Sequence, residues 1–221
     1  MPNWCSTGIT FYSENEEQIK KFQSKLRDIY NMEPTVENGF GHGWLGDYAN
    51  TFFPEIGHDK IECRGYISYI DEDIFERDGY YHFAICTETA WIAMIGMWRE
   101  IVNRFYGGVK IAYIAEECGL DYFEKWDETG LFYPEEMYVD CYYPGKNDED
   151  EYIEDHAFDS VSEVVDWLDK NVTQFKHTRT DDLDALEKET QEGLEKFDGD
   201  YYFSASWYKN SSPEEFQFRK A

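Results

Sequence analysis

Three neighbouring carboxylates, Glu116, Glu117 and Asp121, are the residues whose types and spacing come closest to a catalytic arrangement. Paired carboxylates can divide the roles of general acid and general base when their environments separate their pKa values. The chain contains 47 Asp and Glu residues, however, so adjacent acidic pairs arise by chance along its whole length. We therefore expect this group to lie on a binding surface and the protein not to be an enzyme.

Two further segments contain residues typical of known sites, but the sequence around them does not fit those sites. Residues 41–46 spell GxGxxG, but a dinucleotide site needs a strand before the glycines and a helix after them. His42, Asp47 and His58 could approach one another in the same Gly-rich segment, yet no HxxxH-like spacing fixes them as ligands. We expect a flexible turn here, no bound metal and no cofactor.

A dense acidic run near residue 150 lacks the Asp-x-Asp-x-Asp-Gly order of a calcium loop. It is either a solvated linker or a docking strip for a basic partner. A solvated linker is the default interpretation of such a run, but eighteen Tyr and seven Trp add weight to docking, because both residue types anchor interfaces. The predicted partner-binding residues are Glu116, Glu117, Asp121, Asp148, Glu149, Asp150, Glu151, Glu154 and Asp155. Neutralising Asp148, Glu149, Asp150 and Glu151 together is expected to weaken partner binding and leave the fold intact.

The net charge of −27 is the most unusual property of the chain. It is uneven, because residues 117–221 hold 29 acidic and 10 basic side chains. Such a surface repels nucleic acids and anionic membranes and attracts basic proteins. Duplex DNA carries one charge per about 1.7 Å, so 27 charges match roughly 46 Å of duplex, close to the diameter of about 45 Å expected for a compact domain of this size. The charge therefore indicates mimicry of a nucleic acid.

The apolar periodicity predicts an α+β fold in the order βαββαβ, the ferredoxin-like arrangement. Ser13 and Glu16 form a capping box for the first helix, and Thr87 or Thr89 is the expected N-cap of the second. The strands should pair antiparallel in the order 4-1-3-2, with Phe22, Leu26, Trp91 and Trp98 packed on one face of the sheet. The segments predicted as strands are 4–12, 61–70, 79–86 and 109–115, and residues 35–60 are predicted as a loop.

The remaining third of the chain is predicted as an acidic helical extension. Residues 120–126 and 137–143 could form a hairpin, and the composition then changes after Tyr143. This places a domain boundary between residues 1–143 and 144–221. Ser160 and Glu163 form a second capping box, which predicts a helix from Ser160. A further helix over 180–197 and a strand over 201–208 are expected after it.

Three segments within residues 1–143 resemble the YubB-type ferredoxin-like family of plasmid and phage proteins. They are the MPNWC start, FAICTETAW at 83–91 and AYIAEECGLDYF at 112–123. Here Trp91 is followed by Ile92 and Ala93 where the family has Ser-Pro-Pro, and the family's Trp-Gly-x-Lys-Trp segment has no clean counterpart. The family has no assigned reaction, so the resemblance implies a fold and a mobile-element origin more than an activity.

The cysteines and the N-terminus indicate an intracellular protein. Cys63 and Cys86 lie in apolar segments, and all five cysteines are isolated from one another, so we expect reduced, structural thiols. The first residues lack the basic start and the apolar run of a signal peptide. We expect a cytoplasmic location, in the host cell if the protein is phage-encoded.

Three classes of function are compatible with these features. The first is an acidic phage or plasmid protein that occupies the basic surface of a host nucleic-acid-binding defence protein, such as a restriction or CRISPR nuclease (an anti-CRISPR activity), without binding nucleic acid or membrane itself. The second is an accessory or assembly protein of the mobile element, whose charge keeps it in solution. The third is an enzyme with an unrecognised carboxylate site. The sequence favours the first class.

Overall fold

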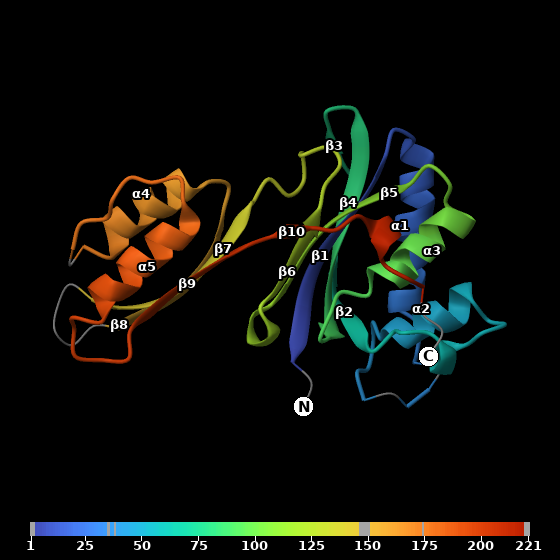
Figure 1. The fold of residues 1–221 in the computed structure, drawn as a ribbon. Helices are drawn as coiled ribbons and strands as arrows, with labels where there is room; N and C mark the ends of the chain where they lie inside the picture. Colours follow the sequence, from blue (N-terminus) through green and yellow to red (C-terminus); the bar gives the residue numbers. More distant parts are fainter. Residues whose placement is uncertain (1–2, 35, 38, 146–150, 174, 219–221) are drawn as a thin grey trace. The chain divides into compact units, whose positions relative to one another are not determined.

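The structure, a computed structural model, describes residues 3–34, 36, 37, 39–145, 151–173 and 175–218. It divides the chain into two compact units, and Figure 1 shows the ribbon. Unit 1 comprises Met1–Tyr133 and Lys209–Ala221, and unit 2 comprises Pro134–Tyr208. Unit 2 is therefore an insertion in the sequence of unit 1.

Unit 1 contains a seven-stranded sheet whose main path runs β10-β6-β5-β1-β4-β2, with β3 paired to β4 beside this path. The neighbours β5, β1, β4 and β2 are antiparallel and stand in the order predicted for these four segments. The elements of unit 1 are β1 (Trp4–Ser13), α1 (Glu16–Tyr30), α2 (Leu45–Phe52), η1 (His58–Lys60), β2 (Gly65–Ile70), β3 (Phe75–Arg77), β4 (Tyr80–Ala90), α3 (Ile95–Phe105), β5 (Lys110–Glu117), η2 (Cys118–Leu120), β6 (Tyr122–Trp126), β10 (Lys209–Asn210) and η3 (Pro213–Glu215).

The core of unit 1 lies between the sheet and the helices α1, α2 and α3 (Figure 1). Phe11 of β1, Phe22 of α1 and Trp98 of α3 are fully buried there. The Phe11 ring contacts both others, with ring centroids 4.8 Å from Phe22 and 5.8 Å from Trp98. Leu26 also lies in this core, so three of the four side chains predicted to pack together do so.

Both predicted N-caps of unit 1 are wrong, because the strands before the helices are longer than the sequence indicates. β1 continues through Ser13, and Asn15 is the residue whose side chain caps α1. β4 continues to Ala90 because it pairs with β1 on one side and β2 on the other, so Thr87 and Thr89 are strand residues and α3 begins at Ile95.

Trp91 is the predicted core residue that the structure places outside the core. Its φ is 68°, which is rare for a residue with a large side chain, and its side chain is 46% exposed. The guanidinium of Arg64 lies over its ring at 5.1 Å. The chain thus turns sharply between β4 and α3, and this turn directs the indole away from the core.

The segment predicted as a loop over residues 35–60 contains α2. The prediction of a loop is wrong here because α2 is short and has no side-chain cap at Trp44, so the sequence lacks a signal for the start of a helix. Leu45, Tyr48 and Ala49 are nevertheless fully buried, and Tyr48 donates a hydrogen bond to the carbonyl of Leu26. Tertiary packing holds this helix in place.

The last described residues of the chain, 211–218, lie across unit 1 and are called the strap. Tyr113 donates a buried 2.7 Å hydrogen bond to the Ser211 carbonyl, and Arg99 donates to the carbonyls of Pro213 and Glu214. Further along the strap, the Phe218 ring contacts Phe53 at 5.0 Å. The strap therefore closes unit 1 after the inserted unit 2.

Gly96 on α3 is expected to be required for docking of the strap, because a Cβ at this position would lie 2.6 Å from the Gln217 carbonyl oxygen. Gly96→Ala should favour the isolated helix but disfavour the docked strap by about 1–3 kcal/mol. Amide hydrogen exchange over 214–218 should accelerate accordingly. Gly107→Ala is the matched control, since a Cβ there meets nothing within 4 Å. Unchanged exchange in the Gly96 variant would contradict the close approach.

Unit 2 is a three-stranded antiparallel sheet in the order β8-β7-β9, with helices α4 and α5 on one of its faces (Figure 1). The second capping box is present, since Ser160 accepts a hydrogen bond from the Glu163 amide. The elements are β7 (Met137–Pro144), β8 (Glu151–Phe158), α4 (Val161–Asn171), α5 (Leu183–Leu194) and β9 (Tyr202–Trp207). The core contains the predicted helical stripe, namely Val161, Val164, Val165, Leu168 and Val172.

The predicted hairpin and the predicted boundary after Tyr143 both differ from the structure. Segment 120–126 contributes β6, which pairs with β5 and β10, whereas segment 137–143 contributes β7, which pairs with β8 and β9. The acidic region beyond residue 150, expected as a helical appendage or linker, contains β8. Because β7 is the central strand of its own sheet, the division falls at residue 134 rather than 144.

The buried cysteines lie in the two cores, where they act as small apolar side chains. Cys5 and Cys63 belong to the core of unit 1 and Cys141 to that of unit 2. Burial raises the pKa of the Cys5 thiol to about 11 and of the Cys63 thiol to about 12. Among the described residues, no helix has both the length and the apolar composition needed to cross a membrane.

Candidate partner-binding surface

The sheet of unit 2 has one face covered by helices and one face without them. Met137, Val139 and Cys141 of β7 point into the core with α4 and α5. Alternate residues of a strand point to opposite faces, so the residues between them lie on the other face. We call this face the Tyr–Asp face, and it comprises Tyr138, Asp140 and Tyr142 of β7, Ile153 and Asp155 of β8, and Tyr202 of β9.

Two carboxylates stand directly opposite each other on this face. The pairing of β7 with β8 places Asp140 across from Asp155. Side chains at such positions have Cβ atoms about 4.5–5.5 Å apart, and like charges there destabilise the sheet. Among the residues that the structure describes, no lysine or arginine forms an ion pair with either carboxylate. The pair is therefore a local concentration of negative charge that no lysine or arginine in the described part of the chain neutralises.

Two tyrosine hydroxyls hold these carboxylates in place. Tyr202 donates to Asp140, with its hydroxyl 3.1 Å from both carboxylate oxygens. Tyr138 donates to Asp155 at 3.0 Å. Both donors are diagonal neighbours on adjacent strands, so the same register that opposes the two charges also supplies a hydrogen bond to each. A neutral donor orients a carboxylate without cancelling its charge, which leaves the charge for an incoming cation.

Aromatic and apolar side chains flank the carboxylate pair. Ile153 lies across from Tyr142, and its side chain is 73% exposed on the edge strand β8. The ring of Tyr142 contacts those of Tyr201 and Tyr202, with centroids 5.1 and 6.2 Å apart. A charged centre beside rigid aromatic rings has the composition of a protein-binding surface, where Tyr supplies contact area at low entropic cost.

Only part of the acidic run that was predicted as a docking strip lies within the described residues, and its members do not share one face. Asp155 lies on the Tyr–Asp face, whereas Glu154 alternates to the helix side, where Tyr143 and His156 contact its carboxylate at 3.1 Å. Glu151 is the first residue of β8. The predicted residues Asp148, Glu149 and Asp150 lie outside the described residues.

The other predicted acidic residues belong to unit 1 and do not share an element with the strip. Glu116 is in β5, and Asp121 follows η2 with a φ of 52°. Glu117 is only 5% exposed and accepts a hydrogen bond from the Gly119 amide at 2.9 Å. The structure therefore places Glu117 in a buried turn, where little of its carboxylate is exposed.

The three residues considered as metal ligands make separate contacts in the structure. Asp47 is buried in α2, and the ring of His58 lies 3.1 Å from the Asn50 side-chain oxygen. His42 contacts the Met32 carbonyl oxygen at 3.1 Å. Across the described part of the chain, no group of three or more His, Cys, Asp or Glu side chains has the geometry of a metal site.

Asp140 and the tyrosines around it are the site residues that sequence reasoning missed. Their signal was the alternation Tyr138-x-Asp140-x-Tyr142 within a segment already predicted as a strand. The opposition of Asp140 and Asp155 depends on register, which the sequence does not supply. No family model, curated protein or solved structure matches the chain, so its function is inferred from the geometry and charge of this surface.

Proposed function

We propose that this protein is a non-catalytic binding protein whose unit 2 occupies a basic surface on a partner protein. The observation that carries the proposal is the Asp140–Asp155 pair. A fold keeps two like charges opposed on neighbouring strands at a cost in stability, and the pair gains a compensating cation when an arginine or lysine of a partner docks. The adjoining tyrosines and Ile153 supply the apolar contact that fixes such a partner.

The charge density of unit 2 supports mimicry of a nucleic acid. Its 75 residues carry 22 acidic and 6 basic side chains, a net charge of −16. Sixteen charges correspond to about 27 Å of duplex, and a compact unit of this length has a diameter of roughly 29 Å. Unit 2 thus has nearly the charge per length of the polymer it would imitate. The partner is then a basic, nucleic-acid-binding protein, and its nucleic-acid site is the surface occupied.

The proposal includes the biological setting that the N-terminal resemblance implies. Unit 1 is proposed to be a ferredoxin-like domain of the YubB-type family, which the neighbouring antiparallel strands β5, β1, β4 and β2 support. A phage or plasmid protein of this kind acts in the host cytoplasm against a defence nuclease or its complex. In this arrangement unit 1 is the scaffold, and unit 2, inserted after β6, is the partner-binding part.

The proposal is tested by capture from host lysate on the immobilised full chain, followed by elution with duplex DNA. We expect a basic nucleic-acid-binding protein to be retained and then released by the DNA. The variant Asp140→Asn/Asp155→Asn should retain much less of it. The variant Asp181→Asn/Asp184→Asn makes the same chemical change at two exposed positions at the start of α5, on the helix side, and should retain a near-normal amount.

Two results would count against the proposal. Retention of the same protein by both variants at equal levels would show that total charge, not the Tyr–Asp face, governs binding. Release by salt but not by DNA would show that the partner's nucleic-acid site is not the surface occupied.

A further inference from the structure

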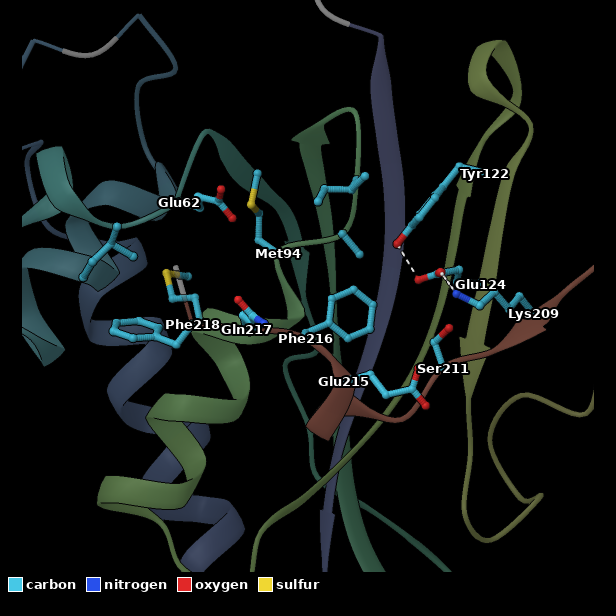
Figure 2. Close-up of a pocket in the computed structure, with 15 residues that line it drawn as sticks. Glu62, Met94, Tyr122, Glu124, Lys209, Ser211, Glu215, Phe216, Gln217 and Phe218 are labelled. Atoms are coloured by element: carbon cyan, nitrogen blue, oxygen red, sulfur yellow. Dashed lines mark hydrogen bonds and ion pairs between the residues drawn. The ribbon is translucent and has the colours of Figure 1, made fainter. Parts of the chain in front are cut away.

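Unit 1 contains a cavity of about 310 Å³ beneath the strap. Its apolar lining includes Ile92 and Met94 from the segment before α3, Met97 from α3 and Phe216 from the strap. Figure 2 shows Glu62 on one side of the cavity and Tyr122 with Glu124 on the other, with Met94 and Phe216 between them. A volume of this size accommodates a small organic molecule.

One wall of the cavity holds an organised carboxylate. Tyr122 donates a 2.8 Å hydrogen bond to Glu124, and Lys209 lies 3.3 Å from the other oxygen of that carboxylate (Figure 2). Glu124 is 12% exposed, whereas Lys209 is 68% exposed. Burial and the neighbouring Glu124 raise the pKa of Tyr122, so its hydroxyl stays protonated and remains a donor. The carboxylate is thus fixed on the tyrosine side, and its cationic partner is a solvated lysine that can move away.

The remaining polar groups of the cavity point to a ligand with hydrogen-bonding capacity. Ser211 is 2% exposed, and its hydroxyl has no hydrogen-bond partner among the described residues. A buried hydroxyl without a partner destabilises the free protein and gains from a bound polar group. Glu62 and Glu215 add two more carboxylates to the lining, against the single lysine.

We propose that this cavity binds a small organic amine, with its ammonium group at Glu124 and its apolar body on Met94, Met97 and Phe216. The negative excess of the lining selects a cation, and the apolar side chains of the lining select an amine with a hydrocarbon body over a metal ion or a bare ammonium. The ligand's ammonium replaces Lys209 at Glu124, and the Ser211 hydroxyl can accept a hydrogen bond from it. This site is separate from the Tyr–Asp face and does not depend on the function proposed for it.

Methionine methyl groups provide a specific readout in the full chain. Met94 and Met97 line the cavity, whereas Met137 lies in the core of unit 2 and Met32 follows α1. With methyl-13C-methionine label and about 150 mM NaCl, where exposed charges are screened, 2-phenylethylamine should shift the Met94 and Met97 resonances saturably and leave Met32 and Met137 unchanged. Its affinity should exceed that of 2-phenylethanol, which lacks the charge, and that of ethylamine, which lacks the ring, by on the order of tenfold each.

Three variants distinguish binding of the amine in this cavity from its general attraction to an acidic protein. Glu124→Gln keeps an acceptor for Tyr122 but removes the charge, and should weaken the binding of 2-phenylethylamine by on the order of tenfold. Glu76→Gln removes an exposed charge in β3 outside the cavity and should change nothing. Lys209→Ala removes the competing cation and should tighten binding.

The proposal is overturned if the Met94 and Met97 methyl groups do not respond, or if the three compounds bind equally. It is also overturned if Glu76→Gln weakens binding as much as Glu124→Gln, because the amine would then respond only to total charge. Weaker binding by Lys209→Ala would show that the lysine recognises the ligand, which excludes an ammonium at Glu124.

Discussion

Trp98→Ala is expected to lower the free energy of unfolding of unit 1 by about 3–5 kcal/mol. The Trp98 side chain is fully buried, and its ring contacts Phe11 of β1 and Tyr48 of α2, with centroids 5.8 and 5.6 Å apart. Removing it leaves a cavity between the sheet and two helices that a rigid core refills only partly. Hydrogen exchange in β1 and β4 should accelerate in parallel, while β7 of unit 2 should keep its protection.

Trp98→Phe is the matched control for this substitution. The indole Nε1 of Trp98 is buried and has no hydrogen-bond partner among the described residues, so phenylalanine removes volume but also removes an unsatisfied donor. We expect a loss below about 1.5 kcal/mol. An alanine variant no less stable than the phenylalanine variant would show that Trp98 does not join the helices to the sheet.

Asp140→Asn/Asp155→Asn is expected to change stability and binding in opposite directions. The amide oxygens still accept hydrogen bonds from Tyr202 and Tyr138, but the two opposed charges disappear. Unit 2 should become more stable by about 0.2–1 kcal/mol, since like charges across a strand pair are destabilising. Affinity for the partner should fall about 30-fold or more, because the partner's buried cations lose about 2 kcal/mol or more of charge interaction.

The opposite signs make this double variant informative. Chemical denaturation of unit 2, followed by exchange in β7 and β8, gives the stability, and titration of the captured partner gives the affinity. A variant that loses both would indicate structural damage to the face. A variant that gains stability and binds normally would show that the opposed carboxylates serve no partner.

Much of unit 1 could be predicted because its signals are local. The strands around Ile9 and Ile85 have β-branched and aromatic runs, and the stripe through Trp98 and Ile101 has helical period. The element ends were less accessible, since Thr87 and Thr89 are good caps in isolation yet pair on both sides within the sheet. Tertiary pairing overrode the local capping signal.

Unit 2 was harder to predict because its edge strand has the composition of a linker. Asp and Glu are depleted in strands, so Glu154 and Asp155 conceal β8 in the sequence. Without β8, the sequence pattern favours a hairpin of β7 with β6. The cavity of unit 1 was equally hidden, because Glu124 and Lys209 meet across 85 positions of sequence. Local periodicity carries no information about such contacts.

The central claim, that unit 2 takes the place of a nucleic acid on a basic partner, is tested most directly by a competition titration. The captured partner is titrated with the full chain between 50 and 200 mM salt, with and without duplex DNA. We predict that affinity falls by on the order of tenfold or more over this range, and that DNA raises the apparent dissociation constant in proportion to its concentration. An affinity that changes with neither salt nor DNA would contradict mimicry and would assign binding to an apolar, tyrosine-anchored contact instead.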